Sequence, residues 1–483
     1  NRGSALAQLK RFEPALECFD RALSLVPDYG EAHSNRGSAL SHLGRFEEAL
    51  LSLQRALACA PQYAEAHCNL GVVMQALKGP AEALPHFERA IELSADHAAA
   101  HRNRGTALAM LDRLEEALQS FDRAVALAAD DAEAFNNRGW ILSRLGRGDE
   151  ARLSFQHAVT HAPQWADPHW NLATEELRSG RFSEGWPPFE YRWKLAGTWP
   201  YRHAAIPQWT GAEPVAGRRV LVWSEQGFGD TLQFCRYVPM LAAQSAQVVL
   251  EVQAALRPLL ASLAGVSELR TPDQAGPPCD LQVPLVSLPL AFGTELNTIP
   301  AQVPYLAADA ARVEQWRQRL GSAPGMPRVG IACSGRAGHK NDANRSMRLA
   351  QLAPLYGRAR LILLQTEVRA EDESELRSAP ILDLRGELSD FGDTAALIEC
   401  LDLVISVDTA VVHLAGALGK PVWVLLPTVA DWRWMRLRTD NPWYPNARLF
   451  RQEQAGDWVR VVRQVVDALD EFSSRALDAG PNP

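Results

Sequence analysis

The stretch LVISVDTAVVHLAGALGKPVWVLL, residues 403–426, places a strand, a turn, a short helix and a second strand in one compact run. Residues 403–407 are continuously apolar and rich in β-branched side chains, which is typical of a strand buried on both faces of a parallel sheet. Residues 422–426 repeat this pattern. The oxygens of Asp408 and Thr409 are expected to cap a helix that ends at Gly419. The stretch therefore predicts a parallel α/β fold.

The turn that opens this helix is also a candidate site. In a strand-helix-strand unit the turn lies at the carboxyl end of the sheet, where free helix N–H groups and the helix dipole favour an anion such as a phosphate. His413, one turn into the helix, can face the same point. The alternative is a well-capped structural helix with a satisfied histidine, and these residues alone do not separate the two.

Length and composition limit the classes of protein to consider. A chain of 483 residues is too long for one core, so about three domains are expected. The net charge of −8 argues against a general nucleic-acid binder, and no apolar run reaches the length of a membrane span. Seven scattered cysteines without a C-x-x-C pair suit a reducing cytoplasm, where we expect this protein. The sequence begins in mid-repeat without methionine, so we expect a fragment.

The first part of the chain repeats itself every 34 residues. NRGSALAQLKRFEPAL at 1, NRGSALSHLGRFEEAL at 35 and NRGTALAMLDRLEEAL at 103 are three of about six copies, the first truncated. Glycine recurs at one helical position and alanine at another, where small residues let paired helices approach closely. The pattern resembles the tetratricopeptide repeat, which implies an α-solenoid, a superhelix with a concave binding groove.

One column of the repeats carries a candidate function. An asparagine early in the first helix of each repeat can hold the backbone of an extended peptide through its amide, which both donates and accepts; the column comprises Asn1, Asn35, Asn69, Asn103, Asn137 and Asn171. The alternative is that each asparagine bonds within its own repeat. Arginines at the next position, such as Arg36 and Arg104, are interpreted as salt bridges between repeats.

Beyond the repeats, strands alternate with helices in two series, which indicates two lobes with parallel sheets. The run QGFGDTLQF places Asp230 at a helix N-terminus after Gly229, where its carboxylate either caps the helix or accepts a proton from an acceptor hydroxyl. The expected organisation is repeats (1–196), connector (197–217), first lobe (218–308), linker (309–326), second lobe (327–455), terminal helix (456–473) and tail (474–483).

The combination of GFGDTLQFCRYVP, DLVISVDTAVVHLAGALGKPVWVLLP and DWRWM resembles the heptosyltransferase-type glycosyltransferase domain that follows tetratricopeptide repeats in many bacterial proteins. The resemblance implies the two-lobed GT-B fold, with two Rossmann-like lobes, and inversion at the anomeric carbon without a metal or other cofactor. It assigns the role of base to Asp230. It also assigns donor sugar and phosphate binding to the loop of Asp408, Thr409, Ala410 and His413, in which Ala410 stands in place of the usual glycine.

Further donor contacts are expected from Gly229 and from the segment SGRAGHKNDANRS, which follows the first strand of the second lobe. Ser334 opens this segment, and Lys340 and Arg345 supply cations that can neutralise a leaving diphosphate as a metal would elsewhere. Solvation at the surface is the alternative for these cations.

The order of repeats and transferase is similar to that of O-GlcNAc transferase, which glycosylates protein hydroxyls, and the analogy is architectural. The expected function is transfer of a sugar from a nucleotide-sugar to a Ser or Thr hydroxyl of a protein held by Asn35, Asn69, Asn103, Asn137 and Asn171. The alternatives are transfer to a glycolipid or polysaccharide, with the repeats used for docking, and a non-catalytic scaffold that binds sugar nucleotides.

Overall fold

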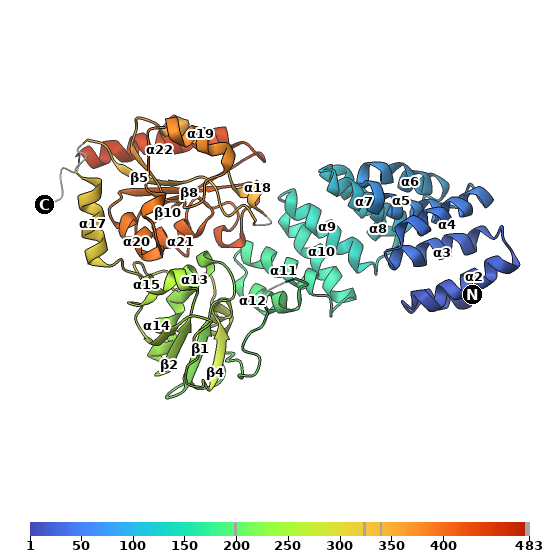
Figure 1. The fold of residues 1–483 in the computed structure, drawn as a ribbon, viewed down its shortest axis with the longest axis horizontal. Helices are drawn as coiled ribbons and strands as arrows, with labels where there is room; N and C mark the ends of the chain where they lie inside the picture. The colour runs from blue at the N-terminus through green and yellow to red at the C-terminus, as the bar shows by residue number, and fades with distance from the viewer. Residues whose placement is uncertain (198–199, 322–324, 339–340, 479–483) are drawn as a thin grey trace. The chain divides into compact units, whose positions relative to one another are not determined.

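The computed structural model describes residues 1–197, 200–321, 325–338 and 341–478, of which 475–478 are described by their backbone only (Figure 1). The chain forms two compact units, Asn1–Glu175 and Glu176–Pro483. The division falls about twenty residues before the expected end of the repeats at 196. The last helix of the repeat series therefore lies in the second unit.

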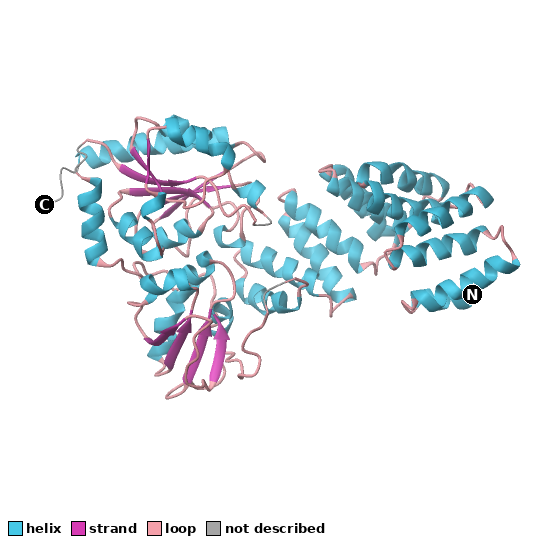
Figure 2. Ribbon diagram, in the orientation of Figure 1, coloured by secondary structure: helices cyan, strands magenta, loops and turns pink. Residues whose placement is uncertain are grey.

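The first unit is a solenoid of helices only (Figure 2). Two helices occupy each 34-residue period, as the sequence predicts; they are α1 (Arg2–Gln8), α2 (Phe12–Leu25), α3 (Gly30–His42), α4 (Phe46–Cys59), α5 (Ala64–Lys78), α6 (Pro80–Leu93), α7 (Ala98–Met110), α8 (Leu114–Leu127), α9 (Ala132–Arg144), α10 (Gly148–His161) and α11 (Ala166–Arg178), which reaches three residues into the second unit.

Each repeat is closed by a glycine of its first helix against an aromatic or aliphatic side chain of its second helix. A Cβ placed on Gly71 would lie 2.5 Å from Cε1 of Phe87, and one on Gly139 would lie 2.6 Å from Cε1 of Phe155. Phe87 and Phe155 are almost fully buried. This confirms that the recurrent glycines permit close approach of paired helices, because any side chain there would overlap the ring.

The arginine column ties neighbouring repeats together, as the sequence suggests. Arg138 Nε donates to Asp122 Oδ1 of the preceding repeat at 2.7 Å, while its Nη1 donates to Ser154 Oγ in its own repeat at 2.6 Å. Arg36 makes the equivalent pair with Asp20 at 2.6 Å. The side chains are partly exposed, so each pair contributes at most about 1 kcal/mol. These ion pairs therefore connect neighbouring repeats but contribute little to the stability of the solenoid.

The second unit contains two separate parallel sheets, drawn in magenta in Figure 2. The first has the order β3-β2-β1-β4. Its strands are β1 (Arg219–Trp223), β2 (Gln247–Glu251), β3 (Val266–Arg270) and β4 (Leu281–Pro284), and its helices are α13 (Phe228–Phe234), α14 (Val238–Ala243), α15 (Arg257–Leu260) and α16 (Leu288–Ala291). Every pairing between these strands is parallel.

The second sheet has the order β10-β9-β8-β5-β6-β7, again with parallel pairings throughout. Its strands are β5 (Arg328–Ala332), β6 (Arg360–Leu363), β7 (Ile381–Asp383), β8 (Leu403–Val407), β9 (Val422–Leu426) and β10 (Ala447–Arg451). Its helices are α17 (Ala310–Leu320), α18 (Asp342–Arg345), α19 (Glu373–Ser378), α20 (Phe391–Glu399), α21 (Ala410–Ala417) and α22 (Trp458–Asp478). In order of appearance the strands run 3-2-1-4-5-6, the doubly wound order of dinucleotide-binding folds.

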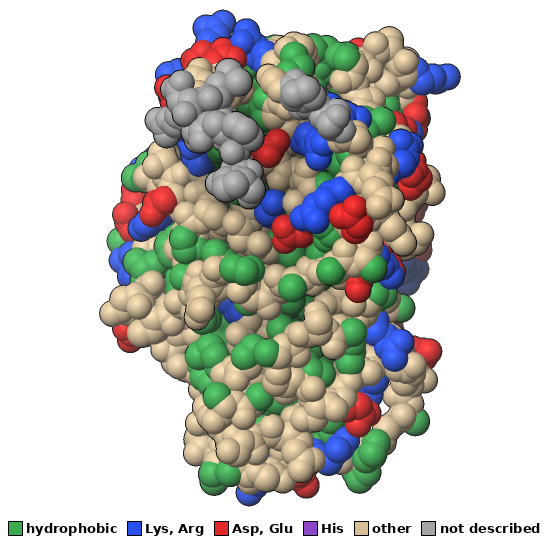
Figure 3. Space-filling model, turned by 90° about the vertical axis from the view of Figure 1, so that its left-hand side faces the viewer, with side chains coloured by type: hydrophobic (Ala, Val, Ile, Leu, Met, Phe, Trp, Pro, Cys, Tyr) green, Lys and Arg blue, Asp and Glu red, His purple; other side chains and the backbone are tan. Residues whose placement is uncertain are grey.

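Short 3-10 helices join these elements; they are η1 (Glu190–Lys194), η2 (Cys235–Tyr237), η3 (Ala254–Leu256), η4 (Leu285–Ser287), η5 (Leu349–Leu355), η6 (Ala370–Asp372), η7 (Arg385–Glu387) and η8 (Trp432–Trp434). The terminal helix α22 buries Trp458, Val461 and Val465 in the core of the second lobe. On the face drawn in Figure 3, acidic and basic side chains are interspersed rather than gathered into a patch of one sign.

Helix α12 (Phe182–Phe189), the last of the repeat series, is built into the α/β unit by aromatic contacts. The ring of Trp186 meets that of Trp432 edge-on at 5.4 Å, and its Nε1 donates to the carbonyl of Thr294 in the first lobe at 2.9 Å. Phe182 packs on Trp443 at 5.9 Å. Trp432, beyond β9, is thus a packing anchor between α12 and the second lobe.

The segment expected as a linker, 309–326, contains α17, which packs on the second lobe. Arg312 in its first turn donates from Nη1 to Asp390 and Asp393 of α20, each at 2.8 Å. This connection is therefore a structural element of the second lobe rather than an irregular tether.

The contact between Gly71 and Phe87 generates a stability prediction. Gly71→Ala should lower Tm, because overpacking costs about 1–3 kcal/mol and outweighs a helix-propensity gain of about 1 kcal/mol. The double variant Gly71→Ala/Phe87→Ala should lose less than the sum of the single variants, because truncation of the ring makes room for the added methyl group. Thermal melts of the four proteins measure this; additive losses would contradict the steric explanation.

Candidate functional site

The site is built at the carboxyl ends of parallel strands from both lobes. In the second sheet the strand order reverses between β5 and β8, and ligands of doubly wound folds bind outside the strand ends at such a switch point. Arg345 follows β5 and Asp408 follows β8, and Arg345 Nη1 donates to the carbonyl oxygen of Asp408 at 3.0 Å. The structure thus brings these two predicted residues together.

The first lobe meets this switch point through a glycine. A Cβ placed on Gly229 of α13 would lie 2.8 Å from Cδ2 of His413 and 3.7 Å from Cα of Ala410, both in α21. Only a residue without a side chain lets the two helix starts approach so closely. Gly229, Ala410 and His413, three of the predicted donor-binding residues, therefore form the contact between the lobes.

His413 is held in a neutral, buried state. Its Nδ1 lies 3.0 Å from the Tyr444 hydroxyl, and its ring stacks on Trp434 with centroids 5.5 Å apart. Burial, helped by the charge of Arg433, lowers the pKa of His413 to about 3. At neutral pH the ring is therefore uncharged, and in this arrangement it fixes the contact between α13 and α21 rather than presenting a cation.

Asp230, the predicted base, lies at the start of α13 with both oxygens engaged. Oδ2 accepts from the backbone N–H of Gly227 at 2.9 Å, and Oδ1 accepts from Nη2 of Arg433 in an ion pair. Burial raises the pKa of Asp230, although the charge of Arg433 opposes this rise. The two interpretations of Asp230 are compatible, because the carboxylate caps the helix and also faces the second lobe.

Arg433, which follows β9 within the motif DWRWM, links Asp230 to a second carboxylate. Its Nη1 donates to Asp431 Oδ1 at 2.8 Å, its Nε donates to Gln233 Oε1 at 2.8 Å, and its guanidinium lies over Trp432 at 4.4 Å. Sequence reasoning used this motif for the family resemblance but missed the role of Asp431. The motif itself was the available signal, because it sits directly beyond a strand end.

Asp408 and Asp431 form a pair of interacting carboxyl groups. Burial and the negative charge of Asp431 raise the pKa of Asp408 to about 6. Burial acts in the same direction on Asp431, but the charge and hydrogen bonds of Arg433 outweigh it and lower the pKa of Asp431. One of the two carboxyl groups is thus close to protonation at neutral pH and can both donate to and accept from a sugar hydroxyl.

The other predicted donor contacts have structural partners or lie outside the described residues. Thr409 is the N-cap residue of α21, but its side chain makes no cap; its Oγ1 lies 3.1 Å from Ser406 Oγ. The expectation that Asp408 and Thr409 cap the helix by their side chains is wrong for Thr409. Ser334 is buried and accepts from Gln365 Nε2 at 3.1 Å. Lys340 lies outside the described residues.

The switch point of the first sheet, between β1 and β4, is filled by the chain itself. Glu225 follows β1, and its Oε1 accepts from the N–H of Val286 at 3.3 Å and from Arg192 Nη2 at 3.1 Å. Arg192, from η1, also donates to Ser287 Oγ at 2.7 Å. Arg192, Glu225 and Ser287 are all buried. The position where the first lobe of a doubly wound fold would take a ligand therefore holds a buried ion pair.

Three members of the asparagine column bond to the preceding repeat, whereas Asn137 Oδ1 accepts from Asn136 Nδ2 of its own helix at 3.5 Å. Asn69 Nδ2 donates to Ser34 Oγ at 3.2 Å, and Asn103 Nδ2 donates to Cys68 Sγ at 3.5 Å, each in the repeat before. Asn171 Nδ2 likewise donates to Asn136 Oδ1 at 2.9 Å. These amides are half-buried and use an N–H for the repeat contact, so their carbonyl oxygens at positions 69, 103 and 171 are the atoms suited to a partner.

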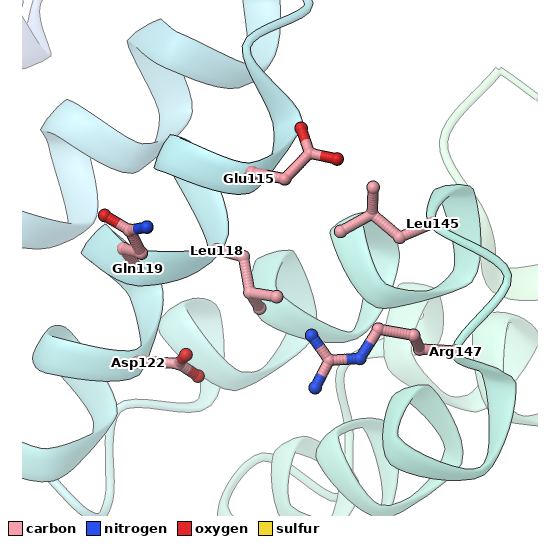
Figure 4. A pocket seen from close by; sticks show the side chains of 6 residues that line it. All are labelled: Glu115, Leu118, Gln119, Asp122, Leu145 and Arg147. Carbon is pink, nitrogen blue, oxygen red and sulfur yellow. The ribbon is translucent and has the colours of Figure 1, made fainter.

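Two surface hollows lie on the repeat unit. One of about 420 Å³ is lined by Ala132, Glu133, Asn137 and Trp165 and includes a member of the asparagine column. The other, of about 390 Å³, is lined by side chains of α8 and of the turn between α9 and α10 (Figure 4): Glu115, Leu118, Gln119, Asp122, Leu145 and Arg147. The second hollow includes no member of the asparagine column and mixes both charges with leucines.

Two findings concern metal ions and membranes. In the described ranges of the chain, no three His, Cys, Asp or Glu side chains are grouped so that they could hold a metal ion. No helix of residues 1–197, 200–321, 325–338 and 341–478 combines the length and apolar character needed to cross a bilayer.

Comparison with known families follows the same division of the chain. Residues 1–64 and 119–168, and separately 62–130, match tetratricopeptide repeat families. Residues 364–455 match glycosyltransferase family 9 (heptosyltransferase). The chain thus combines tetratricopeptide repeats with a C-terminal glycosyltransferase family 9 region, and this region contains Asp408, His413, Asp431 and Arg433.

Three individual proteins are similar to parts of this chain. Protein FlbA of Caulobacter vibrioides is 26% identical over 333 residues, which cover 62% of this chain and 54% of FlbA, so the chain spans about half the length of this relative. TTC0263, a tetratricopeptide repeat protein of Thermus thermophilus, is 27% identical over 36% of this chain and 95% of its own, with a TM-score of 0.33. YrrB, described as having an unusual peptide-binding site, is 26% identical over 34% of this chain and 86% of its own, with a TM-score of 0.28.

The buried Glu225 generates a pH prediction. Burial, against the opposing charge of Arg192, raises the pKa of Glu225 from 4.5 to about 7. The folded protein should therefore lose stability as pH rises from about 4.5 to about 7, with the full penalty present above pH 7. Glu225→Gln should gain stability relative to the parent across this window, by on the order of 1–3 kcal/mol.

Melting temperatures of the parent and the variant between pH 5 and pH 8 test this prediction. Ser287→Ala is the matched control, because it removes another partner of Arg192 without removing a titratable group. Its offset from the parent should stay constant with pH. A constant offset for Glu225→Gln as well would show that this carboxyl does not titrate in the window.

Proposed function

We propose that the chain is an inverting, metal-independent glycosyltransferase of the GT-B type that moves a sugar from a nucleotide-sugar to a Ser or Thr hydroxyl of a protein. The observation that carries this proposal is the meeting of Asp230 from the first lobe with the strand-end residues of the family 9 region. The contact is made by Gly229 against His413 and by Asp230 against Arg433.

The proposed mechanism begins with Asp230. Its carboxylate removes the proton of the acceptor hydroxyl, using a lone pair that neither Gly227 nor Arg433 occupies. The acceptor oxygen attacks the anomeric carbon as the bond from that carbon to the diphosphate oxygen breaks on the opposite face, which inverts the configuration. The proton stays on Asp230, and the electron pair leaves with the nucleoside diphosphate.

The donor is proposed to lie at the switch point of the second sheet. The start of α21, at residues 409–411, and the guanidinium of Arg345 supply backbone N–H groups and positive charge for the leaving diphosphate. Asp408 is suited to hydroxyls of the donor sugar, because its raised pKa lets it act as donor or acceptor. Lys340 is proposed as a further cation on the same segment as Arg345.

A protein acceptor is supported by two features of the chain. The switch point of the first lobe is filled by Arg192 and Glu225, which leaves little room for a small acceptor there. The asparagine column offers carbonyl oxygens at regular repeats, a pattern that can bind the N–H groups of an extended peptide whatever its side chains. The repeats are therefore proposed to present the acceptor, and the cytoplasm is the proposed location.

The test of the whole proposal is co-expression of the chain with candidate acceptor proteins, followed by intact-protein mass spectrometry. The mass increment reports the sugar and the target together. Calorimetry with UDP, ADP, GDP, CMP and dTDP then identifies the donor base. An unmodified protein pool combined with clear nucleotide binding would favour the non-catalytic scaffold instead.

Asp230→Asn should separate base from helix cap. The amide keeps one acceptor oxygen for Arg433 or Gly227 but cannot take a proton and gives up the ion pair, so transfer should fall about a hundredfold or more while the protein stays folded with a lower Tm. Transfer rate and Tm are measured together. Parent-like transfer by a folded Asp230→Asn variant would eliminate Asp230 as the base.

Asp393→Asn is the matched control for that variant. Asp393 also sits in the first turn of a helix, accepts from a backbone N–H, that of Ser389 at 3.0 Å, and pairs with an arginine, Arg312, at 2.8 Å. Neither of these partners belongs to the strand-end site. Substitution of Asp393 should change stability by a similar amount and leave transfer intact.

Replacing Asn69, Asn103 and Asn137 together by Ala should lower glycosylation of the protein acceptor and leave nucleotide binding unchanged, because only the acceptor contacts are removed. Glycosylation is read by mass increment at limiting acceptor. Equal glycosylation by this triple variant would place the acceptor elsewhere.

Asn69 and Asn103 also bond the preceding repeat, so their replacement removes structural hydrogen bonds as well as acceptor contacts. A control variant should lose similar hydrogen bonds but keep the asparagines. Ser34→Ala, Cys68→Ala and Asn136→Ala together remove the groups that contact Asn69, Asn103 and Asn137 while keeping the column itself. Each lost hydrogen bond costs about 1 kcal/mol in either triple variant. Glycosylation should fall in the variant that lacks Asn69, Asn103 and Asn137 and should stay at the parent's level in the control variant.

A further inference from the structure

We infer that Arg433 is a positioning residue for the transfer: anchored on Asp431 and Gln233, its guanidinium holds the Asp230 carboxylate ionised and fixed between the lobes. The inference rests on the function proposed above. It assigns to a second-lobe residue the control of a first-lobe base.

The guanidinium is fixed on three sides. Nη2 donates to Asp230, Nη1 donates to Asp431 Oδ1 at 2.8 Å and Nε donates to Gln233 Oε1 at 2.8 Å. Because the guanidinium is planar and its donors point in fixed directions, these three bonds define its position. Gln233 lies three residues after Asp230, so Arg433 holds α13 at two points about one turn apart.

The backbone that carries Arg433 is fixed as well. The N–H of Arg433 donates to Asp431 Oδ1 at 3.1 Å, and its carbonyl accepts from Asn441 Nδ2 at 2.8 Å. The side chain is only 10% exposed and stacks between Trp432 and Phe234, at 4.4 and 5.6 Å. A cation held this firmly by the second lobe sets where the Asp230 carboxylate can lie.

The charged and titratable groups that face Asp230 come from three segments: the loop after β1, helix α21 and the stretch beyond β9. Glu225 in the loop after β1 and Asp431 beyond β9 are acidic and oppose ionisation of Asp230, as does burial. His413 of α21 is neutral, because burial lowers its pKa to about 3. Arg433 is the cation that acts against these effects. Without it, a buried carboxyl beside two acidic groups takes up a proton and cannot serve as a base.

A second buried arginine, Arg236, also joins the two lobes. It allows the proposed effect of Arg433 on Asp230 to be distinguished from the loss of a contact between the lobes. Arg236 of η2 donates from Nη1 to the carbonyl of Trp443 at 2.7 Å and from Nη2 to the Tyr305 hydroxyl at 2.9 Å. It is as buried as Arg433 and joins the same lobes, but its partners here are carbonyl oxygens and a phenol. Arg236 is therefore a matched control for the loss of a buried interlobe arginine.

The first test is the pH dependence of kcat/KM for transfer. The parent needs ionised Asp230, so its rate rises with pH through the pKa of that group. In Arg433→Gln the acid limb should move up by about one pH unit or more, because the opposite charge is lost. Arg433→Lys, which keeps the charge, should stay near the parent, and Arg236→Gln should lose rate at every pH without moving the limb.

An acid limb of Arg433→Gln at the parent's position would overturn the inference, as would an equal shift in Arg236→Gln. Should Arg433→Gln fail to fold, Arg433→Met, with an apolar side chain and no charge, carries the same expectation. Glu225→Gln identifies any contribution of that carboxyl to the limb, because burial raises the pKa of Glu225 to about 7.

The second test does not depend on turnover. Tm values of the parent, Asp230→Asn, Arg433→Gln and the double variant form a double-mutant cycle, measured at pH 8 and pH 4.5. The two substitutions should be non-additive at pH 8 and closer to additive at the lower pH, because protonation of Asp230 removes the ion pair. Additivity at both pH values would overturn the inference. Coupling at pH 8 in a parent that transfers no sugar would support the ion pair and refute the proposed transfer.

Discussion

The α/β unit depends on one close contact, that of Gly229 in α13 with His413 in α21. A Cβ at position 229 would overlap the imidazole, so the two helix starts can meet only because the residue is glycine. The contact brings the carboxyl ends of strands from two different sheets to one place. Asp230 directly follows the glycine and thereby reaches Arg433, while His413 lies between Gly229 and Tyr444 and stays neutral. The pairing of Asp230 with Arg433 depends on this approach of the lobes.

Buried arginines organise the unit around that contact. Arg433 joins Asp230 to Asp431, Arg345 bonds the carbonyl of Asp408, Arg236 joins the lobes through Trp443 and Tyr305, and Arg192 fills the switch point of the first sheet. Guanidinium groups suit these places, because each has several donors in one plane and keeps its charge when buried. Burial disfavours the charged form of the carboxyl groups beside them. It raises the pKa of Asp230, Asp408 and Glu225, and the neighbouring arginines oppose this rise. Whether each carboxyl is charged is therefore decided by the arginine it faces.

In the repeat unit, each of three positions in the 34-residue period makes one kind of contact. Glycine admits the ring of the paired helix, arginine bonds an acid one repeat back, and asparagine donates to a side chain one repeat back. Because the three positions recur every 34 residues, contacts made by one repeat are made again by the next. The asparagine column gains its regular spacing from this structural use, and the same spacing is what an extended peptide would require.

The sequence alone determined the features that rest on local periodicity. The 34-residue period, the strands at 403–407 and 422–426 and the helix between them follow from residues near in the chain, and the structure confirms them. It also brought Gly229, Asp230, Asp408, Ala410 and His413 forward as one candidate site. Only the tertiary structure decided the partners of these residues. The pairing of Asp230 with Arg433, the role of Asp431, the burial that neutralises His413 and the packing of α12 into the α/β unit all join residues far apart in the chain. Such contacts depend on how two sheets and a helix pack, and no local pattern of side chains encodes that.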